Sequence, residues 1–237
     1  ERISELINEF VASENWHLER GIPYKKSFLF YGEPGTGKSS MIKAMSCETQ
    51  RHIHYLNLST IKNDEDFGTL MGKIKLEETI VVIEDIDTQT DIVFERGDEI
   101  VKDEDYIDEK TGLKIKGDKV QKLTLSAILN HIDGVYNNHN MMLVMTSNHP
   151  EKLDKALLRS GRVDERILFC HCEQESIYKM FQNFYRGHCP DRSAFDNIDV
   201  SKKIFPCDVE NAMRKFSNLP LQALQLVEAN NHSLEKF

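Results

Sequence analysis

Long apolar runs are missing from this chain of 237 residues, since no stretch approaches the ~20 residues that a membrane-spanning helix needs. Internal repeats and low-complexity tracts are also absent, and the hydrophobic share of 40% is ordinary for a globular protein. The length predicts one large domain, or one and a half. The chain begins with Glu1 rather than Met, which leaves room for a membrane anchor or a targeting segment upstream.

An excess of basic residues is lacking as well. The 30 Lys and Arg residues stand against 39 Asp and Glu residues, which gives a formal net charge of −9. An acidic balance of this kind disfavours nonspecific binding of nucleic acid over the whole surface. No nucleic-acid partner is therefore expected, although a local basic patch is compatible with this charge.

Cysteine is scarce, and the odd number of five indicates reduced thiols in an intracellular compartment. Cys170, His171 and Cys172, followed by His188 and Cys189, offer side chains that can ligate zinc. Their C-x-C spacing lacks the two-residue gap that is usual in zinc sites. Partly buried thiols are the favoured interpretation, and a zinc site is the alternative.

A glycine-rich segment, GEPGTGKS at residues 32–39, follows an apolar run at residues 28–31 and precedes a helix-compatible run at residues 41–45. Strand, loop and helix in this order form the context in which the pattern GxxxxGK[ST] binds phosphate. Glycines let several backbone N–H groups point inward, and the helix adds the positive end of its dipole. Lys38 would supply charge to the β- and γ-phosphates, and Ser39 would ligate Mg²⁺. The sequence therefore predicts a nucleoside triphosphate site.

Three carboxylates follow a second apolar run, the β-branched residues 80–83. Such a run is typical of a strand that is buried on both faces of a parallel sheet. It ends in Glu84, Asp85 and Asp87, and acids at this place are costly unless positive charge lies nearby. Because ligands bind at the carboxyl ends of parallel strands, one acid is predicted to hold the Mg²⁺ shell and the next to polarise the attacking water.

Apolar patterning predicts a sheet flanked by helices over residues 1–172. Further strands are predicted near residues 52–58, 141–145 and 166–169. Apolar side chains at helical spacing indicate helices near residues 3–16 and 125–132, and acids at its start indicate a short helix over residues 63–76. Residues 88–120 break this pattern and are predicted to form a charged loop insertion, with a hairpin at residues 106–115.

Beyond residue 173 only helical patterns remain, which predicts a small all-α domain over residues 173–237. One apolar stripe comprises Ile177, Met180, Phe181 and Phe184. A second stripe comprises Val209, Ala212, Met213 and Phe216, and Pro220 is placed to open a third helix. The chain is thus expected to contain an α/β domain followed by a helical one.

Four segments in order carry a family resemblance: GEPGTGKS, VVIEDID, MTSN and LDKALLRSGRVDERI. They resemble the two Walker motifs, the first sensor and the arginine-finger region of an AAA ATPase. The inverted order Glu84-Asp85, the pair Asp133-Gly134 and the segment TSNH are similar to the Bcs-type branch, which includes the mitochondrial translocase of the Rieske iron–sulfur protein. The resemblance covers nearly the whole chain. It implies the α/β fold of a P-loop NTPase, with a parallel five-stranded sheet, flanking helices and a helical lid.

The resemblance also implies a role for each matching residue. It places ATP on the phosphate loop, whose binding residues are Gly32, Glu33, Pro34, Gly35, Thr36, Gly37, Lys38, Ser39 and Ser40. Ser39 and Glu84 are implied as Mg²⁺ ligands, Asp85 as the water-polarising group and Asn148 as the residue that orients the water. Most AAA proteins have Asp-Glu where this chain has Glu84-Asp85, so the division of labour between the two acids stays open. Ile22 and Tyr24 either flank the adenine or pack in the core.

Arg159 and Arg162 match the pair of arginines that reaches into the nucleotide site of a neighbouring subunit. Guanidinium charge supplied in trans accelerates phosphoryl transfer by several powers of ten. The resemblance thus implies a homo-oligomeric ring, hexameric by the habit of the family or heptameric by that of the branch. The alternative is a pair of surface arginines in salt bridges with Asp154, Asp164 or Glu165.

The expected function is ATP hydrolysis by a ring that remodels or translocates a protein substrate. Residues 60–68 lack the pore loop with which unfolding rings grip a chain, and Phe67 is predicted to pack rather than protrude. This fits a branch that moves folded cargo. A nucleic-acid motor or clamp-loader-like ATPase is one alternative, and a nucleotide-gated scaffold with little turnover is another. The implied compartment is mitochondrial if the chain follows its relatives and cytoplasmic otherwise.

Replacing Lys38 by Ala tests the phosphate loop directly. The substitution removes the positive charge predicted to contact the β- and γ-phosphates, so ATPase activity should be lost. The measurement is phosphate release by the purified protein under saturating ATP. Activity that survives the substitution would contradict the predicted site.

Overall fold

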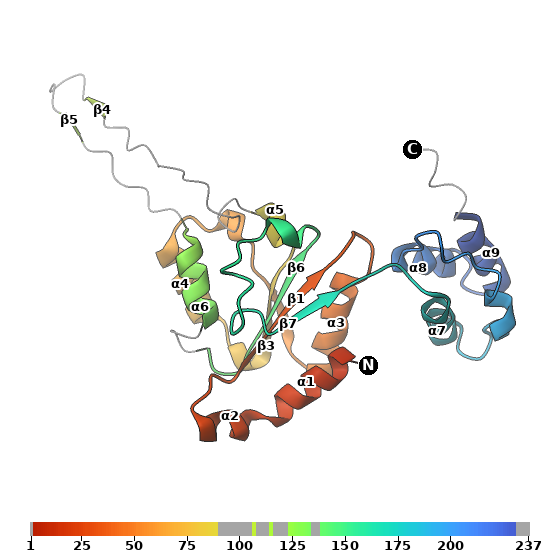
Figure 1. The fold of residues 1–237 in the computed structure, drawn as a ribbon, viewed down its shortest axis with the longest axis horizontal. Helices are drawn as coiled ribbons and strands as arrows, with labels where there is room; N and C mark the ends of the chain where they lie inside the picture. Colours follow the sequence, from red (N-terminus) through yellow and green to blue (C-terminus); the bar gives the residue numbers. More distant parts are fainter. Residues whose placement is uncertain (1, 90–105, 108–113, 116–122, 134–137, 231–237) are drawn as a thin grey trace. The chain divides into compact units, whose positions relative to one another are not determined.

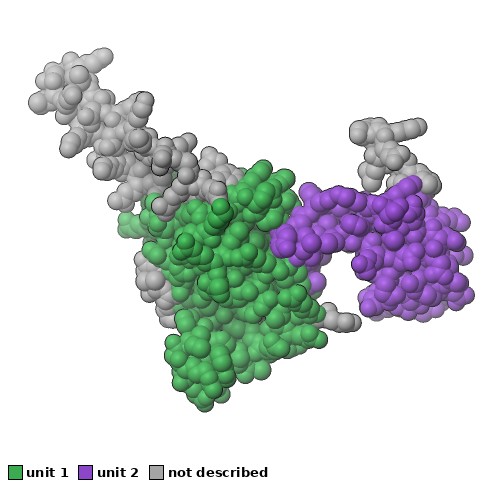
Figure 2. Space-filling view, in the orientation of Figure 1, with its two compact units in different colours: residues 1–30, 42–167 green, residues 31–41, 168–237 purple. Residues whose placement is uncertain are grey.

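The computed structural model describes residues 2–89, 106–107, 114–115, 123–133 and 138–230. The chain divides into two compact units, which Figure 2 shows in different colours. The first spans Glu1–Phe30 and Ile42–Ile167, and the second spans Tyr31–Met41 and Leu168–Phe237. The predicted domain boundary at residue 172 stays a prediction, and the phosphate loop groups with the C-terminal helices by its contacts.

A five-stranded parallel sheet organises the first unit, as the family resemblance implied (Figure 1). Its order is β2-β3-β6-β1-β7. The strands are β1 (Lys25–Tyr31), β2 (His52–Tyr55), β3 (Thr79–Ile83), β6 (Met141–Ser147) and β7 (Glu165–Leu168). Every residue of β3 and β6 is buried, because helices cover both faces of the central strands. The edge strand β7 alternates between half-buried and exposed residues.

Helices pack against both faces of this sheet. Figure 1 shows α4 and α6 together on one side of the strands and α3 on the other. Their bounds are α3 (Lys38–Thr49), α4 (Asp64–Lys73), α5 (Ile86–Gln89) and α6 (Leu125–Asp133), with short 3₁₀ turns η1 (Leu58–Thr60), η2 (Leu76–Glu78) and η4 (Pro150–Lys152). The apolar stripe predicted for α6 is buried as expected.

Phe67 lies in the first turns of α4 and is 2% exposed. Asn63 caps this helix, because its side chain accepts a hydrogen bond from the Asp66 N–H at 2.8 Å. The Phe67 ring packs edge-on against His131 of α6, with ring centroids 4.9 Å apart. The prediction that Phe67 packs rather than protrudes is therefore confirmed.

The N-terminal segment forms two helices, α1 (Arg2–Ala12) and α2 (Glu14–Arg20), where a single helix over residues 3–16 was expected. Ser13 separates them, since both its N–H and its hydroxyl donate to the Phe10 carbonyl, at 3.0 and 2.8 Å. A side chain that bonds to a nearby carbonyl competes with the helical pattern. Gly21 then ends α2 in the left-handed conformation, with φ 62°.

Tyr24 belongs to the core, which decides between its two predicted roles. Its ring stacks on Phe10 with centroids 4.5 Å apart, and its hydroxyl donates to the Phe10 carbonyl at 3.1 Å. A buried tyrosine ring with a satisfied hydroxyl is core packing. Ile22, by contrast, is exposed, so its contact with adenine stays a prediction.

The predicted hairpin within residues 106–115 is present in its two strands. β4 (Tyr106–Ile107) pairs with β5 (Lys114–Ile115) in antiparallel register, with Tyr106 opposite Ile115. Its turn, and most of the charged insertion predicted for residues 88–120, lie outside the described residues.

The C-terminal unit is helical, with α7 (Gln174–Tyr185), η5 (Arg192–Phe195), α8 (Pro206–Lys215) and α9 (Pro220–Asn230). Phe181 and Phe195 form the centre of its core, with ring centroids 5.2 Å apart and no exposed surface. Pro220 opens α9 as predicted. The predicted stripe of α7 is wrong at Phe184, which is exposed, because a spacing of four residues brings Tyr185 inward instead.

Within the described part of the chain, no helix has the length and apolar character needed to cross a membrane.

Truncation of Phe181 tests this helical core. Phe181→Ala should lower the free energy of unfolding by about 3–5 kcal/mol, because it removes a fully buried ring and leaves a cavity. Denaturant unfolding monitored by circular dichroism measures the change. Phe184→Ala, on the same helix but at an exposed position, is the matched control and should cost far less. Equal losses for the two variants would contradict the assigned packing.

Candidate functional site

The phosphate loop connects β1 to α3, and its backbone requires glycine at two crowded positions. Gly32 and Gly35 have φ angles of 143° and 81°, in the region that side chains disfavour. A Cβ atom at Gly32 would lie 2.1 Å from the Phe169 carbonyl oxygen, and one at Gly35 would lie 2.6 Å from the Cys207 sulfur. Conformation therefore disfavours other residues at both positions, and at Gly32 the Phe169 backbone also leaves no space for a side chain.

Lys38 places its charge within the loop. The side chain is largely buried, and its ammonium donates to the carbonyls of Gly32 at 2.7 Å and Glu33 at 3.0 Å. Thr36 donates to the same Glu33 carbonyl at 2.7 Å, which closes the turn. Ser39 is exposed in the first turn of α3. The loop thus presents positive charge and backbone amides at a helix N-terminus, a combination that suits phosphate.

The helical unit touches this loop at two points that the sequence did not predict. The Cys207 N–H donates to the Gly35 carbonyl at 3.2 Å, from the first turn of α8. Lys203 forms an ion pair with Glu33, at exposed positions. Burial raises the pKa of the Cys207 thiol, and the neighbouring Asp208 raises it further, so the thiol stays protonated at neutral pH. No local pattern marks these residues, because they meet the loop only in the folded chain.

The acidic half of the site lies where β3 and β6 end. Asp85 has a left-handed backbone, with φ 44°, and its N–H donates to the Thr146 hydroxyl at 2.8 Å. The Asn148 side-chain amide donates to the Asp85 carboxylate at 3.2 Å. β3 and β6 are neighbours in parallel register, so their carboxyl ends meet at one edge. The structure therefore brings together the two residues predicted to polarise and orient the water.

Asp87 contributes to this edge in a way that its sequence position did not reveal. It is 4% exposed, and its Oδ1 atom accepts the Asn148 N–H at 3.2 Å. Its Oδ2 atom is buried and has no hydrogen-bond partner among the described residues. A buried carboxylate oxygen without a partner is costly unless positive charge or water is close. This edge of the sheet is accordingly suited to a cation and its hydration shell.

Mg²⁺ fits the donor set better than a protein-caged metal does. Within the described residues, no three His, Cys, Asp or Glu side chains converge as a metal site. Mg²⁺ is usually held by one or two carboxylates together with substrate phosphates and waters. The half-buried Glu84 at the end of β3 offers such a carboxylate.

The two predicted trans-acting arginines have different surroundings. The Arg159 side chain is exposed and makes no hydrogen bond or ion pair with the described residues. Arg162 binds Asp133 of its own chain through three N–O contacts of 2.6 to 2.9 Å. In the single chain Arg162 is thus held by an acid of its own subunit, and its reach into a neighbouring site stays a prediction. Asp133 is also not among the salt-bridge partners that the alternative predicted, which were Asp154, Asp164 and Glu165.

The comparison with protein families decides the identity. Residues 28–171 match the family described as "ATPase family associated with various cellular activities (AAA)". The chain belongs to the AAA family. This AAA ATPase is 40% identical over 193 residues to a protein named as an AAA family ATPase, L572, of Acanthamoeba polyphaga mimivirus, which covers 78% of this chain and 97% of that protein.

Proteins named Mitochondrial chaperone BCS1 are also similar to this AAA ATPase. The Bos taurus protein is 32% identical over 235 residues, and the Homo sapiens protein is 31% identical over 232 residues. Each match covers 97% of this chain and 52% of the relative, so the chain spans about half the length of these relatives. The predicted Bcs-type resemblance and the predicted ATPase activity are thereby confirmed.

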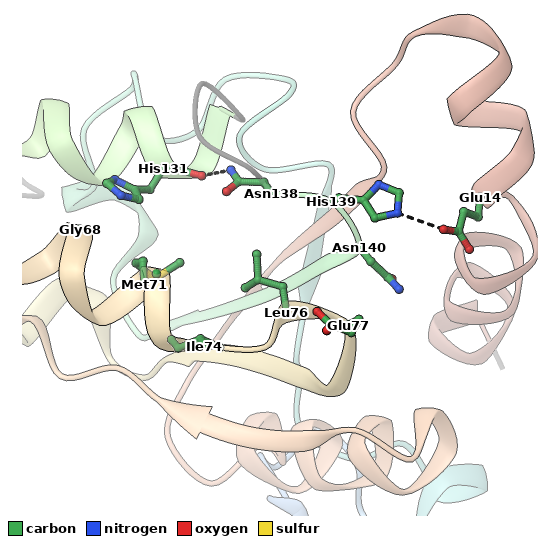
Figure 3. Close-up of a pocket in the computed structure, with 11 residues that line it drawn as sticks. Glu14, Gly68, Met71, Ile74, Leu76, Glu77, His131, Asn138, His139 and Asn140 are labelled. Carbon is green, nitrogen blue, oxygen red and sulfur yellow. Dashed lines mark hydrogen bonds and ion pairs between the residues drawn. The ribbon is translucent and has the colours of Figure 1, made fainter.

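A separate hollow of about 660 Å³ lies at the opposite edge of the sheet (Figure 3). Leu76 and Glu77, just before β3, and Asn138 to Asn140, just before β6, line it. His139 pairs with Glu14 there at 3.0 Å. Because nucleotides bind at the carboxyl ends of the strands, this hollow at their amino ends is not part of the ATP site.

Thr146→Val tests how the Asp85 backbone is held. Valine keeps the shape of threonine but removes the hydroxyl that accepts the Asp85 N–H. Leaving this N–H without an acceptor destabilises the local backbone conformation by about 1–3 kcal/mol. We expect kcat to fall on the order of 10-fold with ATP affinity unchanged, because the phosphate loop is untouched. Steady-state ATPase kinetics and nucleotide titration measure the two quantities. Thr146→Ser keeps the hydroxyl and should retain near-normal kcat, and a loss as large as that of valine would contradict this role.

Proposed function

We propose that this AAA ATPase hydrolyses Mg²⁺-bound ATP at sites completed by a neighbouring subunit, within a homo-oligomeric ring that acts on a protein substrate. The observation that carries the proposal is the contact between Asn148 and Asp85 at the ends of adjacent strands. In the sheet order, β6 lies between β3 and β1, and β1 leads into the phosphate loop. Because the chain belongs to the AAA family, the loop and the acids are proposed to serve one triphosphate.

The phosphate loop would bind the nucleotide. Backbone amides of residues 35–38 would surround the phosphates, and the Lys38 side chain would neutralise charge on the β- and γ-phosphates. Ser39 and Glu84 are the residues proposed to hold Mg²⁺. When bound, the ion would neutralise and orient the phosphates. Ser40 would lie near the α-phosphate.

Asp85 is proposed to polarise the attacking water. It is exposed, so water can reach its carboxylate, and the Asn148 amide fixes the carboxylate from the side. Asp is one methylene shorter than the Glu found at this place in most AAA proteins. The left-handed Asp85 backbone supports its role, because a strained conformation held by specific contacts is common at active sites. Glu84 is then left for the metal shell.

A second subunit would supply Arg159. A guanidinium group stabilises the charge that spreads over the γ-phosphate oxygens in the transition state. The Arg159 side chain is exposed and has no hydrogen-bond or ion-pair partner among the described residues, which supports a role outside its own subunit. An isolated subunit would then hydrolyse ATP slowly, and six or seven subunits would close a ring.

A protein substrate is favoured over nucleic acid. The relatives named as chaperones cover 97% of this chain, and the net charge of −9 opposes nonspecific binding of nucleic acid. The same relatives favour a mitochondrial compartment. A nucleic-acid-dependent motor remains the second candidate, and its signature would be hydrolysis stimulated by DNA or RNA with a steep salt dependence.

Subunit mixing tests the proposed arrangement in trans. Lys38→Ala subunits cannot hydrolyse ATP but still carry Arg159, and Arg159→Ala subunits keep their own site but cannot complete a neighbour's. An equal mixture should regain about a quarter of the wild-type ATPase rate, because half of the sites are intact and half of those have a complete neighbour.

Mixing Lys38→Ala with Asp85→Asn is the control, since both defects lie within one subunit's own site. That mixture should stay inactive. If the first mixture also stays inactive although each variant assembles by analytical ultracentrifugation, the trans role of Arg159 is wrong.

A further inference from the structure

The turn that carries Arg159 is anchored by a network of charged residues, defined here as the arginine-loop clamp: Lys25, Ser27, Asp133, Arg162 and Asp164. These residues come from β1, from the end of α6 and from the segment that leads into β7. Neither a role of the arginines in a neighbour's nucleotide site nor simple surface salt bridges explains why this network surrounds the turn.

The first part of the clamp joins Arg162 to α6. Its Nε atom lies 2.8 and 2.9 Å from the two Asp133 oxygens, and its Nη2 atom lies 2.6 Å from Oδ2. Its Nη1 atom donates to the Ala156 carbonyl at 2.7 Å. The Arg162 side chain is 18% exposed, and the hydrogen bonds to Asp133 raise its pKa. A half-buried arginine with this many contacts has a fixed orientation.

The second part of the clamp joins the same segment to β1. The Asp164 carboxylate accepts from the Ser27 N–H at 2.8 Å and from the Ser27 hydroxyl at 2.7 Å. The Asp164 N–H donates in return to the Ser27 carbonyl at 3.1 Å. The Lys25 ammonium donates to the carbonyls of Ile132 and Gly161, and so links β1, α6 and the arginine turn.

Between these anchors the chain turns tightly. The N–H groups of Arg162 and Val163 both donate to the Arg159 carbonyl at 3.1 Å, and Gly161 adopts φ 87°. The backbone of Arg159 is therefore fixed from its C-terminal side, while its side chain stays exposed. Fixing the backbone of a long side chain reduces the conformational freedom that it must lose on reaching its target.

We infer that the two arginines have separate roles: Arg159 is presented to the neighbouring subunit, and Arg162 is a positioning residue that acts within its own subunit through Asp133. This inference rests on the proposed trans function of Arg159. The opposite arrangement, in which Asp133 holds Arg162 in reserve and releases it to the neighbour's phosphates, predicts an opposite effect for substitutions of Asp133.

The experiment compares Asp133→Asn, Arg162→Ala, their combination and Arg159→Ala in the full-length assembled protein. Arg159→Ala should lower kcat by 10²-fold or more, on the order expected for loss of an arginine in trans. Asp133→Asn and Arg162→Ala should each lower kcat on the order of 10-fold, because the turn is misplaced rather than deprived of its charge. The KM for ATP should stay within about two-fold of the wild-type value in all four variants, because the phosphate loop of the subunit that binds ATP is unchanged.

The double variant gives the most direct evidence. The effects of substitutions at two residues that act through one contact are not additive. The double variant Asp133→Asn with Arg162→Ala should therefore have the same kcat as the single variant with the lower kcat. Arg162→Lys keeps the charge without the fork and should lie between wild type and Arg162→Ala. Arg214→Ala, which breaks an exposed pair with Glu210 in α8, is the matched control and should leave kcat unchanged.

Several results would overturn the inference. A raised kcat in Asp133→Asn would mean that Asp133 restrains Arg162, and an unchanged kcat would mean that this ion pair does not position the turn. Additive losses in the double variant would mean that Arg162 does not act through Asp133. If Arg162→Ala does not assemble, the inference is tested with Arg162→Lys, and a loss of kcat as large as that of Arg159→Ala would overturn it. If Arg159→Ala keeps full activity, the proposed trans function fails, which is a different outcome from failure of the clamp alone.

Discussion

The register between β3 and β6 is the constraint on which the candidate site depends. Ile83 lies opposite Met145, so the residues that follow each strand emerge side by side at one edge of the sheet. That edge holds Asp85 within 3.2 Å of the Asn148 amide. Because side chains alternate along a strand, a slip of one residue would turn each of these groups to the other face. The complete burial of both strands makes such a slip costly, so apolar packing secures the polar geometry.

Irregular backbone around the site is held by polar side chains rather than by regular pairing. The Thr146 hydroxyl accepts the N–H of Asp85, and the Asp87 carboxylate accepts that of Asn148. Gln89 works in the same way, since its amide donates to the Glu84 carbonyl at 2.6 Å while its oxygen accepts the Leu58 N–H at 2.7 Å. Buried backbone groups outside helices and strands need such partners. These side chains therefore hold the backbone that carries the candidate site residues.

Much of the fold follows from local patterns. The strands, α6 and the hairpin strands appear where apolar periodicity predicted them, because periodicity reports which face of an element is buried. The errors arose where one side chain changed a local outcome. Ser13 broke a predicted helix by bonding to the Phe10 carbonyl, and the turn of α7 exchanged Phe184 for Tyr185. Neither effect alters the overall apolar pattern, so neither could be predicted from it.

The candidate site also contains some residues that local sequence patterns predicted and others that they did not. The sequence alone determined the phosphate loop and the acids after β3, because their chemistry is written in contiguous residues and needs only the order strand, loop, helix. Only the tertiary structure decided that Arg162 pairs with Asp133, 29 residues away, while Arg159 stays exposed. It also decided that Cys207 meets the phosphate loop. Two arginines in one motif are equivalent as a pattern, and they differ only because folding brings a carboxylate to one of them.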